Sequence, residues 1–137
     1  MKSIAIVDSG PLVASANSAD PRHRECLRAL EAPEYRLLIP ALCVAEAAYL
    51  IGIRQGAHIE SQFVRALESF DVQAPRPQDW SRIGELVEEY RDFPLGTTDA
   101  SVVTLAERYQ SEIVITLDVR HFAAVRPRHC PSFILLP

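Results

Sequence analysis

Short apolar segments alternate with helical segments along the chain, and this alternation limits the fold more than any other feature of the sequence. Apolar runs bounded by turn residues predict strands at Ser3–Val7, Tyr35–Ile39, Phe70–Ala74, Glu112–Leu117 and Phe133–Leu136. Apolar residues at three- and four-residue spacing predict helices over Leu12–Ala16, Ala41–Arg54, His58–Ser69, Gln78–Arg91 and Gly96–Tyr109, and one more that starts at Asp20 as N-cap and Pro21. Strands that alternate with helices form a mostly parallel sheet covered on both faces. We therefore predict a single α/β domain over residues 1–137.

The composition narrows the class of protein. A formal net charge of -4 argues against a broad basic surface for sequence-blind nucleic-acid binding. Three cysteines without a CxxC pair predict reduced, mostly buried thiols rather than a disulfide framework or a zinc knuckle. The apolar runs are shorter than the roughly 20 residues that cross a bilayer, and Asp8 interrupts the first run too early for a signal peptide. We expect a cytoplasmic protein without a membrane segment.

Four acidic residues stand where the local pattern favours an apolar residue or a cap. Asp8 and Asp118 each follow an apolar strand, and Asp99 opens a helix behind a Gly-Thr-Thr turn. Glu46 is the only charged residue between Pro40 and Arg54, with no Lys or Arg three or four residues away. Its helix is apolar on most of its circumference, which predicts a buried helix. In a parallel sheet the strand ends meet along one edge, so these acids are expected to lie together.

Each acid alone has an ordinary explanation, because Asp8 and Asp99 could cap helices and Asp118 could be a turn residue. Four carboxylates in one crevice repel one another unless they are protonated or bound to a cation. Mg²⁺ prefers a few carboxylates and retains several waters. A metal held in this way lowers the pKa of an attacking water and stabilises the charge that develops on a phosphodiester. The set therefore indicates a metal-dependent phosphodiester hydrolase.

Four segments in order resemble the motifs of PIN domains. IVDSGPLVA is similar to their VDTSxLVA start, and PALCVAEAAYLI is similar to the helix that carries their central Glu. LGTTDASVVTLAERY resembles the third motif, and IVITLDVRHFAAVRP resembles the closing segment, in which TxD is followed by a basic residue and His-Phe. The resemblance runs from about Ile4 to Pro137, and size and ending favour the VapC toxins of type II toxin–antitoxin pairs.

This resemblance implies a three-layer α/β/α fold with a mostly parallel central sheet, Mg²⁺- or Mn²⁺-dependent endoribonuclease activity, a cognate antitoxin that blocks the site, and a homodimer. The catalytic and metal-binding residues that it implies by position are Asp8, Glu46, Asp99 and Asp118. The candidate substrate-binding and supporting residues are Ser9, Thr116 and Arg120. Candidate substrates in the family are tRNA and the sarcin–ricin loop of large-subunit ribosomal RNA.

One departure concerns the third motif. Some relatives carry a further Asp or Asn three to four residues after the motif Asp, where this chain has Val102 and Val103. The site then has four acids at most, and the departure favours one firmly held metal. As a working hypothesis, Asp8, Glu46 and Asp99 hold that metal and Asp118 completes the pocket, while Glu46 also orients or deprotonates the attacking water.

Two other classes of protein share some of these features. A PIN-like module could bind RNA or protein without cleavage, although the intact acids argue against it. A response-regulator receiver also places an Asp at a strand end, but it needs an acidic pair after the first strand and a Lys after the last. Asp8 has no acidic neighbour and the only Lys is Lys2, so this class is nearly excluded. His121 is predicted to pack or turn rather than bind, and His129 beside Cys130 is not expected to bind metal.

Overall fold

A five-stranded parallel sheet forms the centre of the computed structural model, which describes residues 1–32 and 34–137. Its strands are β1 (Ser3–Val7), β2 (Tyr35–Pro40), β3 (Asp71–Gln73), β4 (Ile113–Ile115) and β5 (Ile134–Leu136). Their order in the sheet is β3-β2-β1-β4-β5, and every described pair of neighbours is parallel. The carboxyl ends of the strands therefore lie along one edge, as the sequence predicted.

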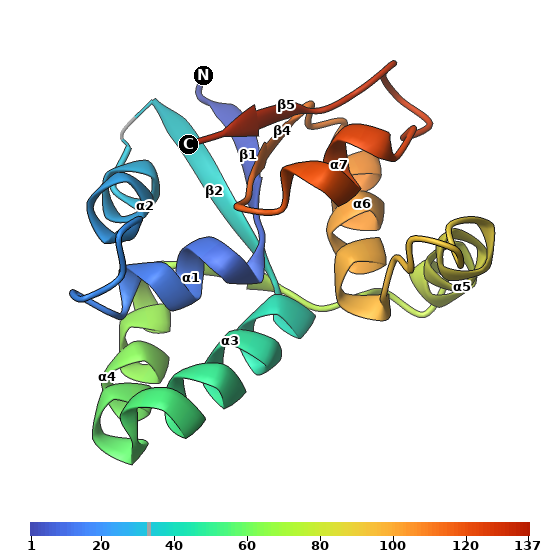
Figure 1. Ribbon diagram of the computed structural model, residues 1–137. Coiled ribbons are helices and arrows are strands. Elements are labelled where there is room, and N and C mark those ends of the chain that lie inside the picture. The colour runs from blue at the N-terminus through green and yellow to red at the C-terminus, as the bar shows by residue number, and fades with distance from the viewer. Residues whose placement is uncertain (33) are drawn as a thin grey trace.

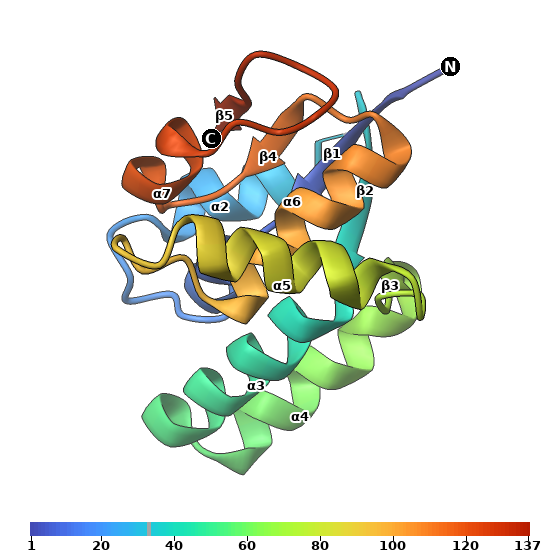
Figure 2. The ribbon, with the colours of Figure 1, turned by 90° about the vertical axis from the view of Figure 1, so that its right-hand side faces the viewer.

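Helices cover both faces of this sheet (Figures 1 and 2). They are α1 (Ser9–Ser15), α2 (His23–Leu30), α3 (Ala41–Gln55), α4 (Ala57–Ala66), α5 (Asp79–Glu89), α6 (Thr97–Tyr109) and α7 (Val119–Ala124), with a 3₁₀ turn at Leu67–Ser69. In Figure 1 α1 and α2 lie on one side of the sheet, α5 and α6 lie on the other, and α3 extends beyond the strand ends. This confirms the predicted three-layer α/β/α architecture. The described helices include none with the length and hydropathy needed to cross a membrane.

The core follows from the two-sided cover of the sheet. Ala5, Ile6 and Val7 of β1 are fully buried, as are Val114 and Ile115 of β4. These strands are apolar on both faces because helices pack on both faces. The middle of α6 is also buried. Its packing against the sheet holds the helix in place, and Asp99 in the first turn is thereby positioned relative to the central strands.

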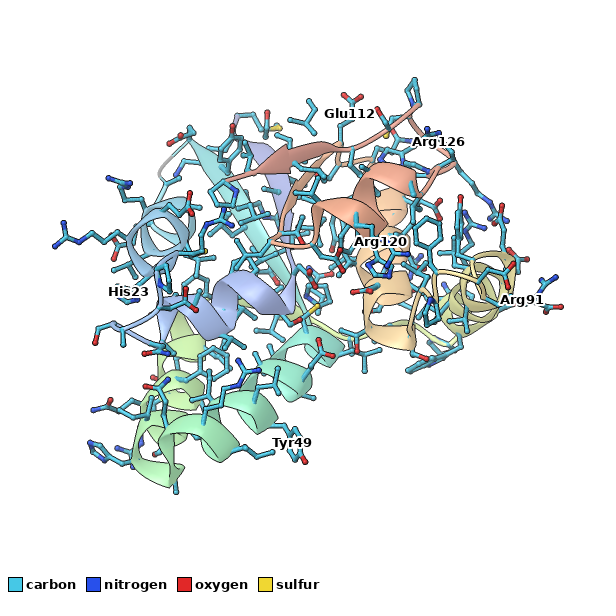
Figure 3. The ribbon with its side chains drawn as sticks, viewed as in Figure 1. His23, Tyr49, Arg91, Glu112, Arg120 and Arg126 are labelled. Atoms are coloured by element: carbon cyan, nitrogen blue, oxygen red, sulfur yellow. The ribbon has the colours of Figure 1, made fainter. Side chains whose placement is uncertain are left out.

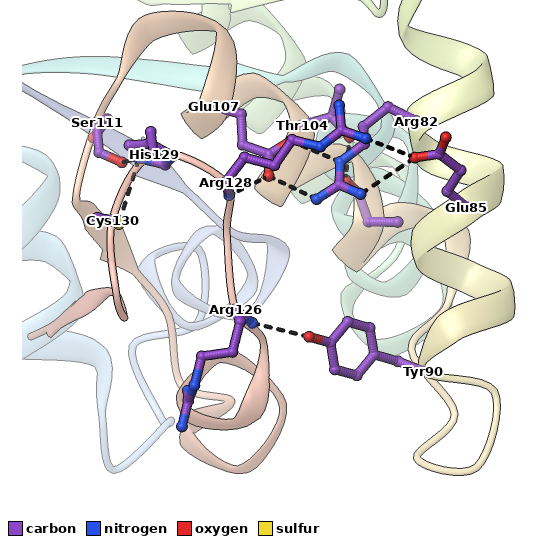
Figure 4. Close-up of polar contacts among 11 residues, drawn as sticks. Arg82, Glu85, Tyr90, Thr104, Glu107, Ser111, Arg126, Arg128, His129 and Cys130 are labelled. Carbon is purple, nitrogen blue, oxygen red and sulfur yellow. Dashed lines mark hydrogen bonds and ion pairs between the residues drawn. The ribbon is translucent and has the colours of Figure 1, made fainter.

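An ion-pair network joins α5 to α6 on the outer side of the domain (Figure 4). The Arg82 guanidinium donates to both carboxylate oxygens of Glu107, each at 2.8 Å. The backbone N–H of Arg128 donates to Glu107 at 2.8 Å, and Glu85 pairs with both Arg82 and Arg128. Bidentate Arg–carboxylate pairs have fixed geometry. The network therefore holds the C-terminal half of α6 against α5.

The predicted burial of the helix that carries Glu46 is wrong. Only Cys43, Ala47 and Ile51 of α3 are buried, whereas Tyr49 is 67% exposed and Ile53 is 64% exposed. The helix packs against α1, α4 and α6 through one face and leaves the other uncovered. Apolar residues all around a helix do not distinguish a core helix from one that presents an uncovered apolar face.

Among the differences from the sequence prediction are one helix start and one element type. The second helix begins at His23 and not at Asp20-Pro21, because the Asp20 side chain accepts a hydrogen bond from the Arg22 N–H and closes a turn. The segment that holds His121, predicted as a turn, forms the short helix α7. Its N-cap is Asp118, whose side chain accepts from the His121 N–H at 3.1 Å.

Candidate active site

Asp8 lies at the end of β1 and is the N-cap of α1. It is only 4% exposed, and its carboxylate accepts hydrogen bonds from the Ser9 N–H and the Thr116 hydroxyl, both at 2.8 Å. Burial raises the pKa of Asp8, with smaller opposing effects of these two hydrogen bonds and a further rise caused by Glu46 and Asp118. The hydrogen bonds thus fix the orientation of the Asp8 side chain, whereas its burial disfavours the ionised carboxylate.

Thr116 connects the ends of β1 and β4. Its hydroxyl donates to Asp8, and the same oxygen accepts from the Asp118 N–H at 2.9 Å. β1 and β4 are neighbours in the sheet, so Asp8 and Asp118 are held at adjacent strand ends. The Asp118 carboxylate also lies 2.8 Å from the His121 ring Nδ1. Thr116 is therefore a bridge between two predicted acids, and its hydroxyl faces the interior.

Asp99 stands in the first turn of α6 and faces the same place. Ligand atoms of Asp99, Asp118 and His121 all lie within 4.8 Å of one another. The pKa of Asp99 is raised to about 7, first by burial and then by the charges of Asp8 and Asp118, while His121 lowers it. The raised pKa thus reflects a buried place where negative charges are also close together.

Glu46 reaches the cluster from α3. Its side chain is exposed, and its Oε2 atom accepts a hydrogen bond from the Ser9 hydroxyl at 2.5 Å. The same hydroxyl lies 3.5 Å from Asp8, so Ser9 connects these two acids. Beneath them the Cys43 thiol is buried, and its pKa is raised well above the usual value by burial and then by Asp8, Glu46 and Asp99. The expected acid on this helix is present, but it stands at the rim rather than in the interior.

The four predicted acids therefore surround one region at the carboxyl edge of the sheet. Within the described residues, none of them forms an ion pair with a Lys or Arg. Among the described residues, the one basic side chain that pairs with any of these acids is His121, and its partner is Asp118. Crowded carboxylates without a compensating charge fit a hard divalent cation with oxygen ligands. Arg120, labelled in Figure 3 beside α6 and α7, is exposed and lies next to this region.

Sequence reasoning did not identify two residues near the site. His121 was predicted to pack, which its contact with Phe93 confirms, and its ring also contributes to the group with Asp99 and Asp118. Phe93, from the loop between α5 and α6, packs on the His121 ring at a centroid distance of 5.5 Å. The three-residue spacing between Asp118 and His121 was a sequence signal that could have identified His121. No comparable signal marked Phe93, which lies two residues before the third motif and meets α7 only in the folded chain.

The chain has clear relatives. The PIN domain family matches residues 5–126. Ribonuclease VapC26 of Mycobacterium tuberculosis is 30% identical over 134 residues, covering 96% of this chain and 99% of the relative.

Solved structures show the same fold. Mycobacterium tuberculosis VapC20, described as a sarcin–ricin loop cleaving toxin, superposes with a TM-score of 0.75 at 15% identity, covering 80% of this chain and 86% of that chain. A toxin–antitoxin complex from Klebsiella pneumoniae has a TM-score of 0.68 at 24% identity, with 95% and 99% covered. DNA-bound VapBC from Salmonella typhimurium has a TM-score of 0.69 at 16% identity, with 98% and 97% covered. The sequence matches and the shared architecture agree, and this chain belongs to the PIN domain family as a VapC-type member.

Proposed function

We propose that this chain is a divalent-metal-dependent endoribonuclease that acts as the toxin of a type II toxin–antitoxin pair in the cytoplasm. The observation that carries the proposal is the crowding of Asp8, Glu46, Asp99 and Asp118 at one strand edge, where burial first and then the neighbouring acids raise the pKa of Asp99 to about 7. Burying several carboxylates together lowers the free energy of unfolding, and a bound cation offsets this loss of stability by neutralising their charge. The VapC relatives named above support RNA as the substrate.

The four acids would hold one Mg²⁺ or Mn²⁺ ion, which supplies positive charge to the phosphate and makes its bound water more acidic. Ser9 and Thr116 position the acids, because their buried hydroxyls donate to Glu46 and Asp8. Glu46 is the most exposed of the set and is the group best placed to accept a proton from the attacking water. Hydrolysis would leave a 5′-phosphate and a 3′-hydroxyl.

Arg120 is the proposed contact for the RNA backbone. It follows Asp118 by two residues and is exposed. A guanidinium donates to two phosphate oxygens at once, which suits substrate orientation at the edge of an acidic pocket. We propose tRNA or the sarcin–ricin loop as the substrate, with inhibition of translation as the outcome.

An antitoxin and a second copy of the chain are the proposed protein partners. Three of the structural neighbours are described as VapBC assemblies, which supports an antitoxin partner. The apolar side chains of Tyr49, Ile53 and Val64 are exposed on α3 and α4, and they are candidates for burial in such contacts.

The test combines growth and cleavage. Expression of the chain alone should arrest growth, and co-expression of a small antitoxin encoded upstream should relieve the arrest. Sequencing of 5′-phosphate RNA ends after induction should reveal one dominant cleavage site. Purified protein should cut that RNA with Mg²⁺ or Mn²⁺ and lose the activity in EDTA.

Asp99→Asn removes one carboxylate from the cluster and should abolish cleavage. Asp71→Asn is the matched control, because Asp71 is a surface acid of β3 paired with Arg36 outside the cluster. Full cleavage by the Asp99→Asn protein would contradict the proposal. Retained RNA binding with no cleavage by the wild-type protein under any metal would favour a binding module instead.

A further inference from the structure

Phe93 has side chains of α7 packed on its ring next to the carboxylate cluster. The Arg120 Cζ atom lies 5.3 Å from the ring centroid, and the His121 ring lies 5.5 Å away at an interplanar angle of 54°. Tyr90 packs on the same ring at 6.3 Å. The ring therefore connects the end of α5 with Arg120 and His121, which follow Asp118 by two and three residues.

The loop that carries Phe93 is held in place by hydrogen bonds. The N–H groups of Phe93 and Leu95 both donate to the Tyr90 carbonyl, at 3.1 and 3.0 Å. The Tyr90 hydroxyl accepts from the Arg126 N–H at 3.0 Å, a contact drawn in Figure 4. These contacts tie the loop to the segment that follows α7. The backbone of the loop is thus fixed, and the Phe93 ring packs between Tyr90, Arg120 and His121.

The Arg120 guanidinium has an unused capacity for binding. In the part of the chain that the structure describes, it makes no hydrogen bond and no ion pair, and its contact with Phe93 is a cation–π contact. The guanidinium lies over the Phe93 ring, and the side of this exposed group away from the ring and its N–H donors remain available. A charged side chain held in this way beside the pocket presents a flat surface of nucleobase-like shape.

We propose that Phe93 and Arg120 form a stacking platform for one nucleobase of the RNA next to the cleaved bond, with the guanidinium between the Phe93 ring and the base. This inference rests on the proposed ribonuclease function. Unpaired RNA bases stack on aromatic rings and on Arg planes. The net charge of -4 gives the chain little general attraction for RNA, so a contact with a base adds affinity that phosphate contacts alone do not supply. Phe93 is a positioning residue, because it acts on the RNA through Arg120.

The His121 ring completes the support on the side of the acids. Its Nδ1 atom lies 2.8 Å from Asp118, which fixes the orientation of the ring, and its flank rests on Phe93. The platform and the carboxylate cluster therefore share one rigid boundary. A base stacked on Arg120 would keep the adjoining phosphate at a constant distance from the acids.

The test measures RNA binding without cleavage, in protein that carries Asp99→Asn. Two fluorescent probes of equal length are compared by anisotropy at several salt concentrations: an oligoadenylate and an abasic ribose-phosphate oligomer. We expect the oligoadenylate to bind more tightly. Arg120→Lys keeps the charge but loses the plane, so it should weaken oligoadenylate binding by about tenfold and abasic binding much less, with the salt dependence unchanged.

Phe93 is tested with a pair of variants. Phe93→Leu should weaken oligoadenylate binding in the same way as Arg120→Lys, whereas Phe93→Tyr keeps the ring and should bind like the parent protein. Thermal unfolding of each variant establishes that it is folded. Equal affinity of the parent protein for both probes, or no effect of Arg120→Lys, would overturn the platform and leave Arg120 as a phosphate contact. Absence of binding to either probe at low salt would also overturn the platform, whereas the proposed ribonuclease function is tested separately by cleavage of RNA.

Discussion

Replacement of Asp99 by Asn should stabilise the metal-free protein, although it should remove the catalytic site. The pKa of Asp99 is 3.8 in an ordinary setting and is raised to about 7 in the folded protein by burial and by Asp8 and Asp118. Between these two values the folded state keeps a proton that the unfolded state has lost. The free energy of unfolding therefore falls as pH rises through this window, and the full penalty is present above about pH 7.

The magnitude follows from the size of the shift. A rise from 3.8 to about 7 corresponds to about 4 kcal/mol, and partial exposure of the side chain and solvent screening reduce the expected effect to about 2 kcal/mol. The neutral Asn side chain does not carry this penalty. The variant should accordingly be about 2 kcal/mol more stable than the wild type at pH 8 in EDTA, and the difference should shrink towards pH 5.

Urea unfolding followed by circular dichroism gives the free energies of unfolding at both pH values. Added Mn²⁺ should stabilise the wild type with a logarithmic dependence on concentration and should stabilise the variant much less. Asp79→Asn is the control, because Asp79 is a buried acid that pairs with Arg108 outside the cluster. It should lower the stability at both pH values and leave the response to Mn²⁺ intact. An Asp99→Asn protein that is no more stable than the wild type at pH 8 in EDTA would refute the reasoning.

Three further predictions address other parts of the molecule. Thr116→Val removes the hydroxyl that links Asp8 to the Asp118 N–H, so calorimetry should show metal affinity reduced by about tenfold in a folded protein. Leu86→Ala leaves a cavity under α5 and should cost about 2–5 kcal/mol in urea unfolding, with metal binding unchanged. Arg82→Ala leaves the nearly buried Glu107 without its bidentate partner and should cost about 3–5 kcal/mol, whereas the exposed Arg24→Ala should change stability little.

The sheet and the positions of the acids could be predicted because both depend on local pattern. The run Ser3–Val7 is apolar on both faces of a strand, which is the mark of a central parallel strand. Asp8 and Asp118 follow strands that turned out to be neighbours, so their meeting was a consequence of topology. The convergence of Asp99 and Glu46 on the same region also agrees with the sequence reasoning.

Other features depend on contacts that no local pattern encodes. The exposed side of α3 carries apolar residues such as Tyr49 and Ile53, as a buried face does. The sequence pattern therefore led to the wrong prediction that this helix is buried. Phe93 gains its place from a loop that folds back onto α7. The Thr116 hydroxyl could be recognised as a hydrogen-bonding group, but its partner lies 108 positions away along the chain.

The long separation between Asp8 and Thr116 also determines when the carboxylate cluster can assemble during synthesis of the chain. A chain that emerges from the ribosome N-terminus first exposes Asp8 early, while the neighbouring strand β4 and the acid that follows it are made much later. Until β4 has emerged, Asp8 has neither its strand neighbour nor the hydroxyl that orients it. The four acids can therefore surround one region only after most of the chain, including β4 and Asp118, has been synthesised.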